Sequence, residues 1–198
     1  MYDTVDVVIA SYKEDLRWLP WLPSHWCRHV YCTSPDRDDL PEGTILLPNV
    51  GREATQYLEH LVRNYGNYAD VTLFLQGCPF DHAPKALIEI FLNSRFPHPI
   101  CYVGASAPSL AWSNGVPFFK EAKDVFAKAY GDEPIGEGIP FSVGAQFYVR
   151  REVIMARPLA FYERLLDAAM TLPGSPGHYL EPSWGSVFDW KPFFAGKS

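Results

Sequence analysis

The sequence predicts a single α/β domain with a mainly parallel central sheet flanked by helices. Two short, mostly apolar and β-branched runs, Val5–Ala10 and Val71–Leu75, have the composition of buried strands. Between them, Asn49–Tyr65 has the amphipathic spacing of a helix. Strands that alternate with helices along the first half of the chain imply right-handed βαβ units, and therefore a largely parallel sheet.

The composition fits one domain spanning residues 1–198. A chain of 198 residues buries one sizeable core, and 47% hydrophobic against 20% charged residues is an ordinary globular balance. Aromatic residues make up 15%, which suits a core and also pockets that stack flat ligands. The four cysteines form no CxxC pair, which favours free thiols over disulfides.

The charge pattern argues against several partners. The formal net charge is -6 and no dense Lys/Arg run occurs, so nucleic acid and anionic membranes are disfavoured. No apolar stretch reaches ~18 residues, and the N-terminus lacks the regions of a signal peptide. We therefore expect no membrane span and a cytoplasmic location.

The remaining elements of the first half follow in chain order. Leucines and tryptophans predict a short helix over Glu14–Leu22, interrupted by Pro20, and further strands are expected at His29–Thr33 and Thr44–Leu47. Asn49 is a good N-cap for the helix that follows. The apolar face of that helix consists of Ala54, Leu58, Leu61, Val62 and Tyr65.

The second half predicts shorter elements. Pro84 suits the first turn of a helix that runs to Asn93. From about residue 173 the tail is expected to be irregular and aromatic. The other expected elements are a strand at Ile100–Val103, a loop from Ser106 to Pro117, a helix at Phe118–Ala129, a loop at Gly131–Pro140, a strand at Ala145–Val149 and a helical segment at Arg151–Met170 broken at Pro158.

Three segments are expected at the carboxyl ends of strands, where ligands bind in α/β sheets: Ser11–Asp15, Asn49–Glu53 and Gln76–His82. In the last segment Asp81 and His82 are adjacent after a sharp turn. A carboxylate beside an imidazole binds a divalent metal or exchanges a proton with a substrate. The alternative is that Asp81 only caps the helix that follows.

The start of the amphipathic helix is a candidate phosphate site. Free N–H groups there, with Gly51 permitting close approach and Arg52 supplying a fork of donors, suit an anion. A plain capped helix with Arg52 in solvent is the competing interpretation.

Two later segments also carry candidate residues. Gly144 leaves room for a close approach, and Gln146 needs a partner if it is buried in its apolar strand; tight packing alone also accounts for both. In the tail, Glu181 is a candidate general base and His178 a candidate ligand, near Trp184. A surface turn is the alternative there.

Several familiar motifs are absent or incomplete. No P-loop, GxGxxG, GxSxG or HExxH occurs, which disfavours kinases, nicotinamide dehydrogenases and ordinary α/β-hydrolases. Asp36–Asp38 spells DxD, but its polar surroundings indicate a solvated turn. His25, Cys27, His29 and Cys32 match no standard zinc-finger spacing, and their apolar, aromatic segment favours a structural role.

Five segments together resemble a family catalogued as domain of unknown function 3431, and they span about Val7 to Phe188. That family looks like a relative of the GT-A glycosyltransferases, which transfer a sugar from a nucleotide donor. The segments are VVIASYKEDLRWL, NVGREATQYLEHLVRNY, ADVTLFLQGCPFDH, FSVGAQFYVRRE and FYERLL.

The resemblance implies a GT-A-like fold and a set of roles. The first strand would end in the nucleotide pocket, Arg52 would approach the diphosphate, and Gly144–Gln146 would face donor and acceptor. The expected substrate-binding residues are Ala10, Ser11, Tyr12, Asn49, Arg52, Gln76, Gly144, Gln146 and Trp184.

The chemistry is expected at two carboxylates. Asp81 takes the place of the metal-binding carboxylate, and Asp81 or Glu181 would deprotonate the acceptor hydroxyl. The expected metal ligands are Asp81, His82 and His178, and the ion would be Mn²⁺ or Mg²⁺.

The leading expectation is a glycosyltransferase-like enzyme that uses a nucleotide-sugar donor and an unspecified acceptor. Two alternatives belong to other classes. One is a metal-dependent hydrolase built on Asp81 and His82, and the other is a non-catalytic module that binds carbohydrate or protein through aromatic stacking.

Overall fold

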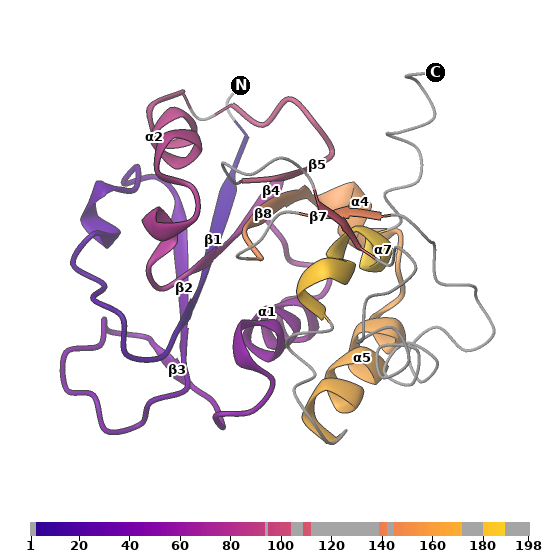
Figure 1. Cartoon of the computed structure of the whole chain (residues 1–198), viewed down its shortest axis with the longest axis horizontal. Coiled ribbons are helices and arrows are strands. Elements are labelled where there is room, and N and C mark those ends of the chain that lie inside the picture. The colour runs from indigo at the N-terminus through magenta and orange to yellow at the C-terminus, as the bar shows by residue number, and fades with distance from the viewer. Residues whose placement is uncertain are drawn as a thin grey trace.

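The computed structural model describes residues 3–93, 95–103, 109–111, 139–141, 145–171 and 180–188. Its strands are β1 (Val5–Ser11), β2 (Cys27–Cys32), β3 (Ile45–Leu46), β4 (Val71–Gln76), β5 (Ile100–Tyr102), β6 (Ser109–Ala111), β7 (Ile139–Phe141) and β8 (Phe147–Arg150). Six of them form one sheet in the order β3-β2-β1-β4-β8-β5, and β6 pairs with β7 (Figure 1).

Helices flank this sheet (Figure 1). The α-helices are α1 (Arg52–Arg63), α2 (Pro84–Asn93), α4 (Arg151–Met155), α5 (Leu159–Thr171) and α7 (Trp184–Val187). Three short 3₁₀ turns are η1 (Leu19–Trp21), η2 (Pro79–Asp81) and η3 (Glu181–Ser183).

The six-stranded sheet is mixed. β1 is parallel to both of its neighbours, β2 and β4, and β2 is parallel to β3. β8 runs antiparallel to β4 and to β5. The prediction of an α/β domain with a sheet flanked by helices is confirmed, and the mainly parallel sheet becomes a mixed one because β8 is inserted in the reverse direction.

The core has two layers, one on each face of the sheet. On one face, Val8 and Ala10 of β1 pack with α1, α5 and α7. On the other face, Val7 and Ile9 of the same strand pack with η1 and α2. Because side chains alternate along a strand, a largely apolar run supplies both layers, and all of β1 is buried, Asp6 included.

Two expectations about local structure are wrong. The helix over Glu14–Leu22, predicted with an interruption at Pro20, is reduced to the single turn η1, because Pro20 lacks the N–H that a longer helix needs. Gly51, and not Asn49, occupies the N-cap position of α1. In the tail, the described residues 180–188 contain η3 and α7, and the rest of the segment expected to be irregular lies outside the described residues.

Two expected loops each contain strand residues. β6 lies inside the stretch from Ser106 to Pro117, and β7 begins at the end of Gly131–Pro140. The helix expected at Phe118–Ala129 lies outside the described residues. The other expected strands and helices are found within a few residues of their predicted bounds.

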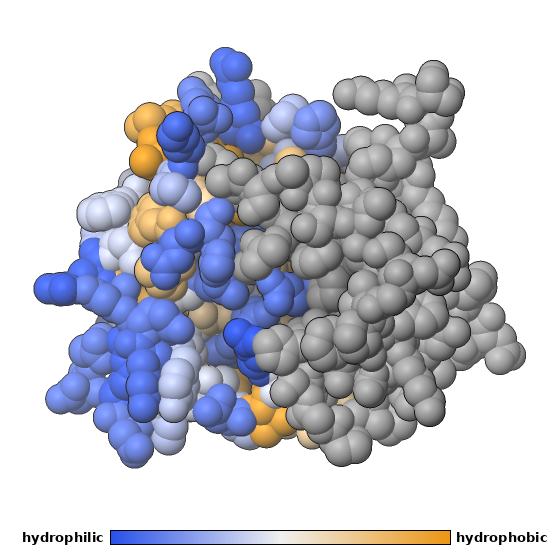
Figure 2. Space-filling model, viewed as in Figure 1, coloured by the Kyte–Doolittle hydropathy of each residue, from blue (hydrophilic) through white to orange (hydrophobic). Residues whose placement is uncertain are grey.

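The described surface in the view of Figure 2 is mostly hydrophilic, with a hydrophobic patch in the region of α2. α2 exposes Ile88 and Leu92 there. No helix among the described residues is long and apolar enough to cross a membrane.

Candidate functional site

A cavity of about 330 Å³ lies at the carboxyl ends of β1 and β4. In the sheet, β2 and β3 follow β1 on one side, and β4 lies on the other side of β1. The order in which the chain adds strands therefore reverses between β1 and β4. Such a switch point is where ligands bind in open α/β sheets. The lining residues are Ala10, Ser11, Tyr12, Glu14, Thr33, Asn49, Arg52, Glu53, Gln56, Gln76, Cys78 and Asp81.

The structure brings most of the residues predicted for the substrate site into this cavity. They come from three separate parts of the chain, as the topology of parallel strands requires. These residues are Ala10, Ser11, Tyr12, Asn49, Arg52 and Gln76, and Asp81, which was predicted as a metal ligand and base, also lines the cavity.

The start of α1 forms one wall of the cavity and has an unusual backbone. Gly51 has φ 72° and Arg52 has φ 57°. The left-handed region is uncommon and costly for a residue with a side chain such as Arg52. The N-cap residue, Gly51, has no side chain to cap the helix, and the Glu53 carboxylate accepts a hydrogen bond from its own backbone N–H. The first turn of α1 therefore offers its other N–H groups and the positive end of its dipole.

Glu53 adds a buried carboxyl group to the same wall. Only 9% of its surface is exposed. Burial raises its pKa, its own backbone N–H and the Arg52 guanidinium oppose that shift, and the negative charge of Glu181 adds to it. A buried carboxyl with a raised pKa in a cavity is a common feature of functional sites.

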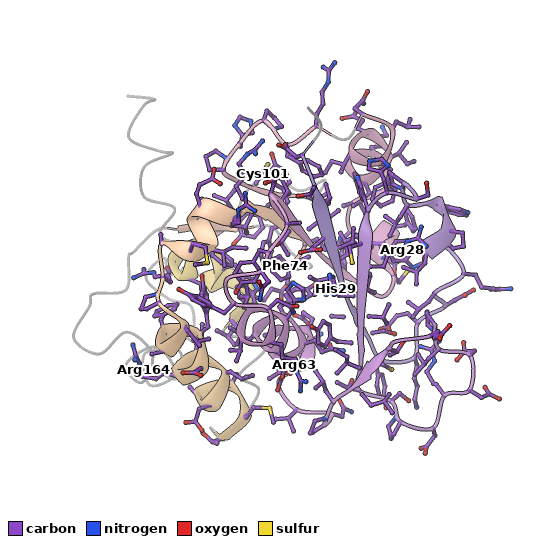
Figure 3. All side chains as sticks on the ribbon, turned by 180° about the vertical axis from the view of Figure 1, so that it is seen from behind. Arg28, His29, Arg63, Phe74, Cys101 and Arg164 are labelled. Atoms are coloured by element: carbon purple, nitrogen blue, oxygen red, sulfur yellow. The ribbon has the colours of Figure 1, made fainter. Side chains whose placement is uncertain are left out.

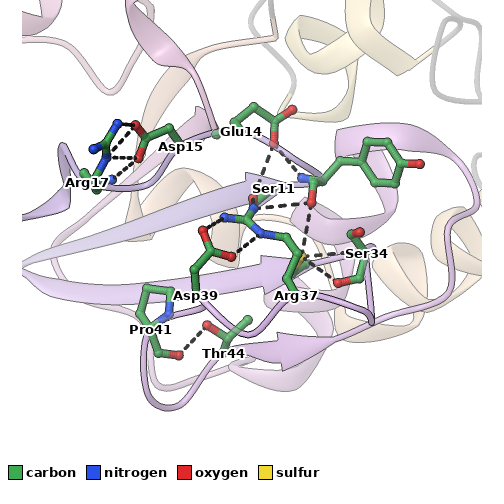
Figure 4. A network of polar contacts seen from close by, with 12 residues as sticks. Ser11, Glu14, Asp15, Arg17, Ser34, Arg37, Asp39, Pro41 and Thr44 are labelled. Atoms are coloured by element: carbon green, nitrogen blue, oxygen red, sulfur yellow. Dashed lines mark hydrogen bonds and ion pairs between the residues drawn. The ribbon is translucent and has the colours of Figure 1, made fainter.

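The loop after β1 is held by a hydrogen-bond network that Figure 4 shows in close-up. A Glu14 Oε2 atom accepts hydrogen bonds from the Tyr12 backbone N–H at 2.6 Å and the Ser11 hydroxyl at 3.3 Å. Arg37 donates to the Ser11 Oγ at 3.2 Å, and its guanidinium pairs with Asp39 at 2.8 Å. Ser11 and Tyr12 are therefore fixed before any ligand arrives.

Gln56 fixes the floor of the cavity. Its Nε2 atom donates to the backbone carbonyls of Ser11 and Tyr31, both at 2.8 Å. The first carbonyl belongs to the last residue of β1, and the second lies one residue before the end of β2. One side-chain amide from α1 therefore holds the ends of two strands together.

The turn after β4 brings a thiol and a carboxylate to the cavity. Asp81 is exposed at the end of η2. Burial raises the pKa of the Cys78 thiol, and so does its hydrogen bond to Asp81. His82 follows η2 and is half-buried, but it is not among the residues that line the cavity.

The other predicted residues lie elsewhere. Gln146 is fully buried, and its Nε2 donates to the Pro79 carbonyl at 3.0 Å, so it supports η2 from behind. Trp184 is fully buried against Phe147, with ring centroids 5.2 Å apart. Glu181 in η3 is half-buried and close enough to Glu53 to affect its pKa.

Two predicted residues, Gly144 and His178, lie outside the described residues. The convergence of Asp81, His82 and His178 on one metal therefore stays a prediction.

Sequence reasoning did not single out Glu14, Thr33, Glu53, Gln56 or Cys78 as site residues. Glu14, Glu53 and Cys78 fall inside the three strand-end segments, so a closer reading of those segments would have found them. Gln56 lies one helical turn after Arg52 and Glu53. Helical spacing alone therefore places its side chain next to theirs on the surface of the helix.

A second, larger hollow of about 1010 Å³ adjoins the first, because Glu14 lines both. Its lining includes the basic residues Lys13, Arg17, Arg28 and Arg37.

Residues 7–89 match the model of a family described as a protein of unknown function, DUF3431. No curated protein matches the chain. The matched stretch supports the resemblance expected from the motifs over the first half of the chain only. It contains every residue that lines the smaller cavity.

Proposed function

We propose that the cavity at the carboxyl ends of β1 and β4 binds a nucleotide-sugar donor, and that the protein is a GT-A-like glycosyltransferase. The observation that carries the proposal is the meeting of three features in one cavity: the start of α1 with glycine at its N-cap, the Arg52 side chain and the Asp81 carboxylate. Together they offer anion recognition and metal coordination at one switch point.

The nucleoside would lie against the end of β1. Tyr12 is 41% exposed, so its ring offers a face for stacking a base. The side chains of Thr33 and Gln76 line the same cavity and supply hydrogen-bonding groups for the base or the ribose. The network around Ser11 and Glu14 holds this wall in place, which lowers the cost of ordering it on binding.

The diphosphate would lie at the start of α1. Helix N–H groups and a guanidinium fork are well matched to phosphate oxygens. The donor set around Asp81 is rich in carboxylate oxygen, with Glu14 and Glu53 in the same cavity, and such oxygens suit Mn²⁺ or Mg²⁺. Bound there, that cation would neutralise charge on the departing diphosphate.

Glu181 is the better candidate for the general base. Its charge acts on the pKa of Glu53 in the cavity wall, although Glu181 itself is not among the lining residues, while Asp81 is the residue suited to hold the cation. In the transfer, the acceptor oxygen forms a bond to the anomeric carbon of the sugar and the bond from that carbon to the diphosphate breaks. The acceptor proton goes to the Glu181 carboxylate.

Thermal-shift and calorimetric titration with a panel of nucleotide sugars and nucleoside diphosphates, with and without Mn²⁺, tests the proposal. We expect stabilisation by one nucleotide class that increases with Mn²⁺ and is lost in Asp81→Asn. Asp38→Asn is the matched control, because Asp38 is exposed, belongs to the DxD-like loop and does not line the cavity.

Three results would contradict the proposal. No stabilisation by any nucleotide at millimolar concentration would exclude a donor site. Tight metal binding without nucleotide that is lost in Asp81→Ala and His82→Ala would favour the metal-dependent hydrolase. Carbohydrate binding that survives both Asp81→Ala and His82→Ala would indicate a non-catalytic binding module.

A further inference from the structure

Three potential metal ligands meet at the opposite end of β1 from the cavity. Asp6 of β1 is in register with Cys27 of the parallel strand β2, and Val8 is in register with His29. Because side chains alternate along β2, Cys27 and His29 point to the same face of the sheet. Figure 3 shows His29 and Arg28 on opposite sides of that strand.

The ligand atoms of these side chains already form a compact group. One atom from each of Asp6, Cys27 and His29 lies within 4.8 Å of the others. The His29 Nε2 atom is 3.1 Å from the Asp6 Oδ1 atom. The second carboxylate oxygen of Asp6 accepts a hydrogen bond from the Ala69 backbone N–H at 2.9 Å, which fixes the orientation of the carboxylate.

A buried imidazole adjoins the group. The His60 ring of α1 lies 4.7 Å from the His29 ring, centroid to centroid, and His60 is fully buried. Its Nδ1 atom is 3.1 Å from the Tyr31 hydroxyl oxygen, while its Nε2 atom has no hydrogen-bond partner among the described residues. A buried polar atom without a partner is costly, and its persistence calls for an explanation.

A thiol beside a histidine and a carboxylate also suggests a nucleophile. The His29 Nε2 atom lies 3.1 Å from the Asp6 Oδ1 atom, so this imidazole nitrogen pairs with the carboxylate and not with the Cys27 sulfur. The three side chains, with one ligand atom each within 4.8 Å of the others, form instead a set of ligands that transition metals bind.

We propose that Asp6, Cys27 and His29 bind a divalent transition-metal ion, and that Zn²⁺ is the ion this set of oxygen, sulfur and nitrogen ligands suits. Tetrahedral zinc holds its ligand atoms roughly 3.4–3.8 Å apart, so shifts of about 1 Å close the present arrangement. Cys27 is exposed, which leaves the fourth position open to water. On binding, the Cys27 thiol proton leaves to the solvent.

This metal site is distinct from the cavity of the proposed transferase. Asp6 and Ser11 are five residues apart along β1, which is about 16 Å at the rise of a strand. A metal there would tie the starts of β1 and β2 together. The inference does not depend on the transferase proposal.

Zinc content after equilibrium dialysis, and absorption spectra with Co²⁺ in place of zinc, test the site. We expect one ion per chain and a thiolate-to-cobalt charge-transfer band. Cys27→Ser and His29→Gln should each abolish the band and weaken Zn²⁺ binding by more than about tenfold, because even groups that only orient metal ligands contribute about 10–100-fold. Circular dichroism checks that both variants fold.

Cys78→Ser and Asp81→Asn are the controls, because they alter the thiol and the carboxylate at the cavity and leave the group around Asp6 intact. Both should bind Co²⁺ with the wild-type spectrum. The proposal is overturned if the charge-transfer band disappears in Cys78→Ser, if it survives in Cys27→Ser, or if the wild-type protein binds no Zn²⁺ at micromolar concentration.

Discussion

At the scale of single residues, Glu53 has a buried carboxyl group, and this burial opposes its ionisation. It lies in the wall of the cavity with 9% of its surface exposed, and burial raises its pKa above the usual value of 4.5. Ionising this carboxyl therefore costs more free energy in the folded protein than in the unfolded chain. Residues that destabilise a fold in this way concentrate at functional sites.

Glu53→Gln is accordingly expected to raise the free energy of unfolding at neutral pH, by on the order of 1 kcal/mol. The folded pKa is raised, so the stability contributed by the protonated form is fully present below pH 4.5 and is lost as the pH rises through the folded pKa. Urea unfolding at acid and neutral pH measures this. The two proteins should match at acid pH and separate as the pH increases.

Glu89→Gln on the exposed side of α2 is the control for that measurement, and it should leave the pH profile unchanged. A wild-type protein that stays as stable as Glu53→Gln at neutral pH would show that the Glu53 carboxylate is satisfied in the folded state.

Two buried tyrosines allow a matched test of hydrogen bonding. The Tyr162 hydroxyl donates to the Ile154 carbonyl at 2.8 Å, whereas the Tyr57 hydroxyl has no partner in the described part of the chain. Tyr162→Phe should lower the free energy of unfolding by about 1 kcal/mol. Tyr57→Phe should leave it equal or higher, since it removes a buried polar group. Equal losses in both variants, measured by urea unfolding, would contradict this assignment.

At the scale of elements, the junction before α1 depends on Gly51. Its φ of 72° is unfavourable for any other residue, and an added Cβ would collide with the Thr55 side chain and lie 3.3 Å from the Ala169 carbonyl of α5. Gly66 has φ 86° but open space around it. The two glycines therefore share the backbone cost and differ in the contacts.

Gly51→Ala should lower the free energy of unfolding more than Gly66→Ala does. Both lose about 1–2 kcal/mol to the left-handed backbone, and only Gly51→Ala must also displace Thr55 and press α1 away from α5. Thermal and urea unfolding of the two variants measures the difference. Similar losses would mean that α1 and α5 shift apart without cost.

The elements that sequence reasoning found are those whose pattern is local. β1 and β4 are mostly apolar runs, and α2 begins at a proline and was predicted with its bounds, Pro84–Asn93. The direction of β8 was not predictable, because a hydrophobic strand reads the same in either direction and its orientation depends on the long connection from β5.

The residues of the candidate site also fall into those that a local sequence pattern predicts and those that it does not. The strand-end rule found Ser11, Arg52 and Asp81 from topology alone. Gln146 and Trp184 were expected to contact the substrate, and their complete burial results from tertiary packing that no local pattern reports. The group of Asp6, Cys27 and His29 depends on the register of β1 against β2, which the spacing of His25, Cys27, His29 and Cys32 does not reveal.

At the scale of the whole molecule, β1 connects two chemically different ends of one sheet. Its carboxyl end borders the cavity, and its amino end carries Asp6 beside Cys27 and His29. β1 is buried throughout and pairs along its length with both β2 and β4. A rigid strand of this kind separates the two sites, so each ligand should act locally.

Hydrogen exchange with and without each ligand tests this separation, read at amides that exchange by local opening and not by global unfolding. Mn²⁺ with the nucleotide that stabilises the protein most should slow exchange at residues 11–14 and 51–56. Zn²⁺ should slow it at residues 27–30, next to His29, and leave the cavity amides unchanged. If Zn²⁺ slows exchange around the cavity, or the nucleotide slows it around Cys27, the two sites are coupled and the assignment of separate roles to the two ends of β1 fails.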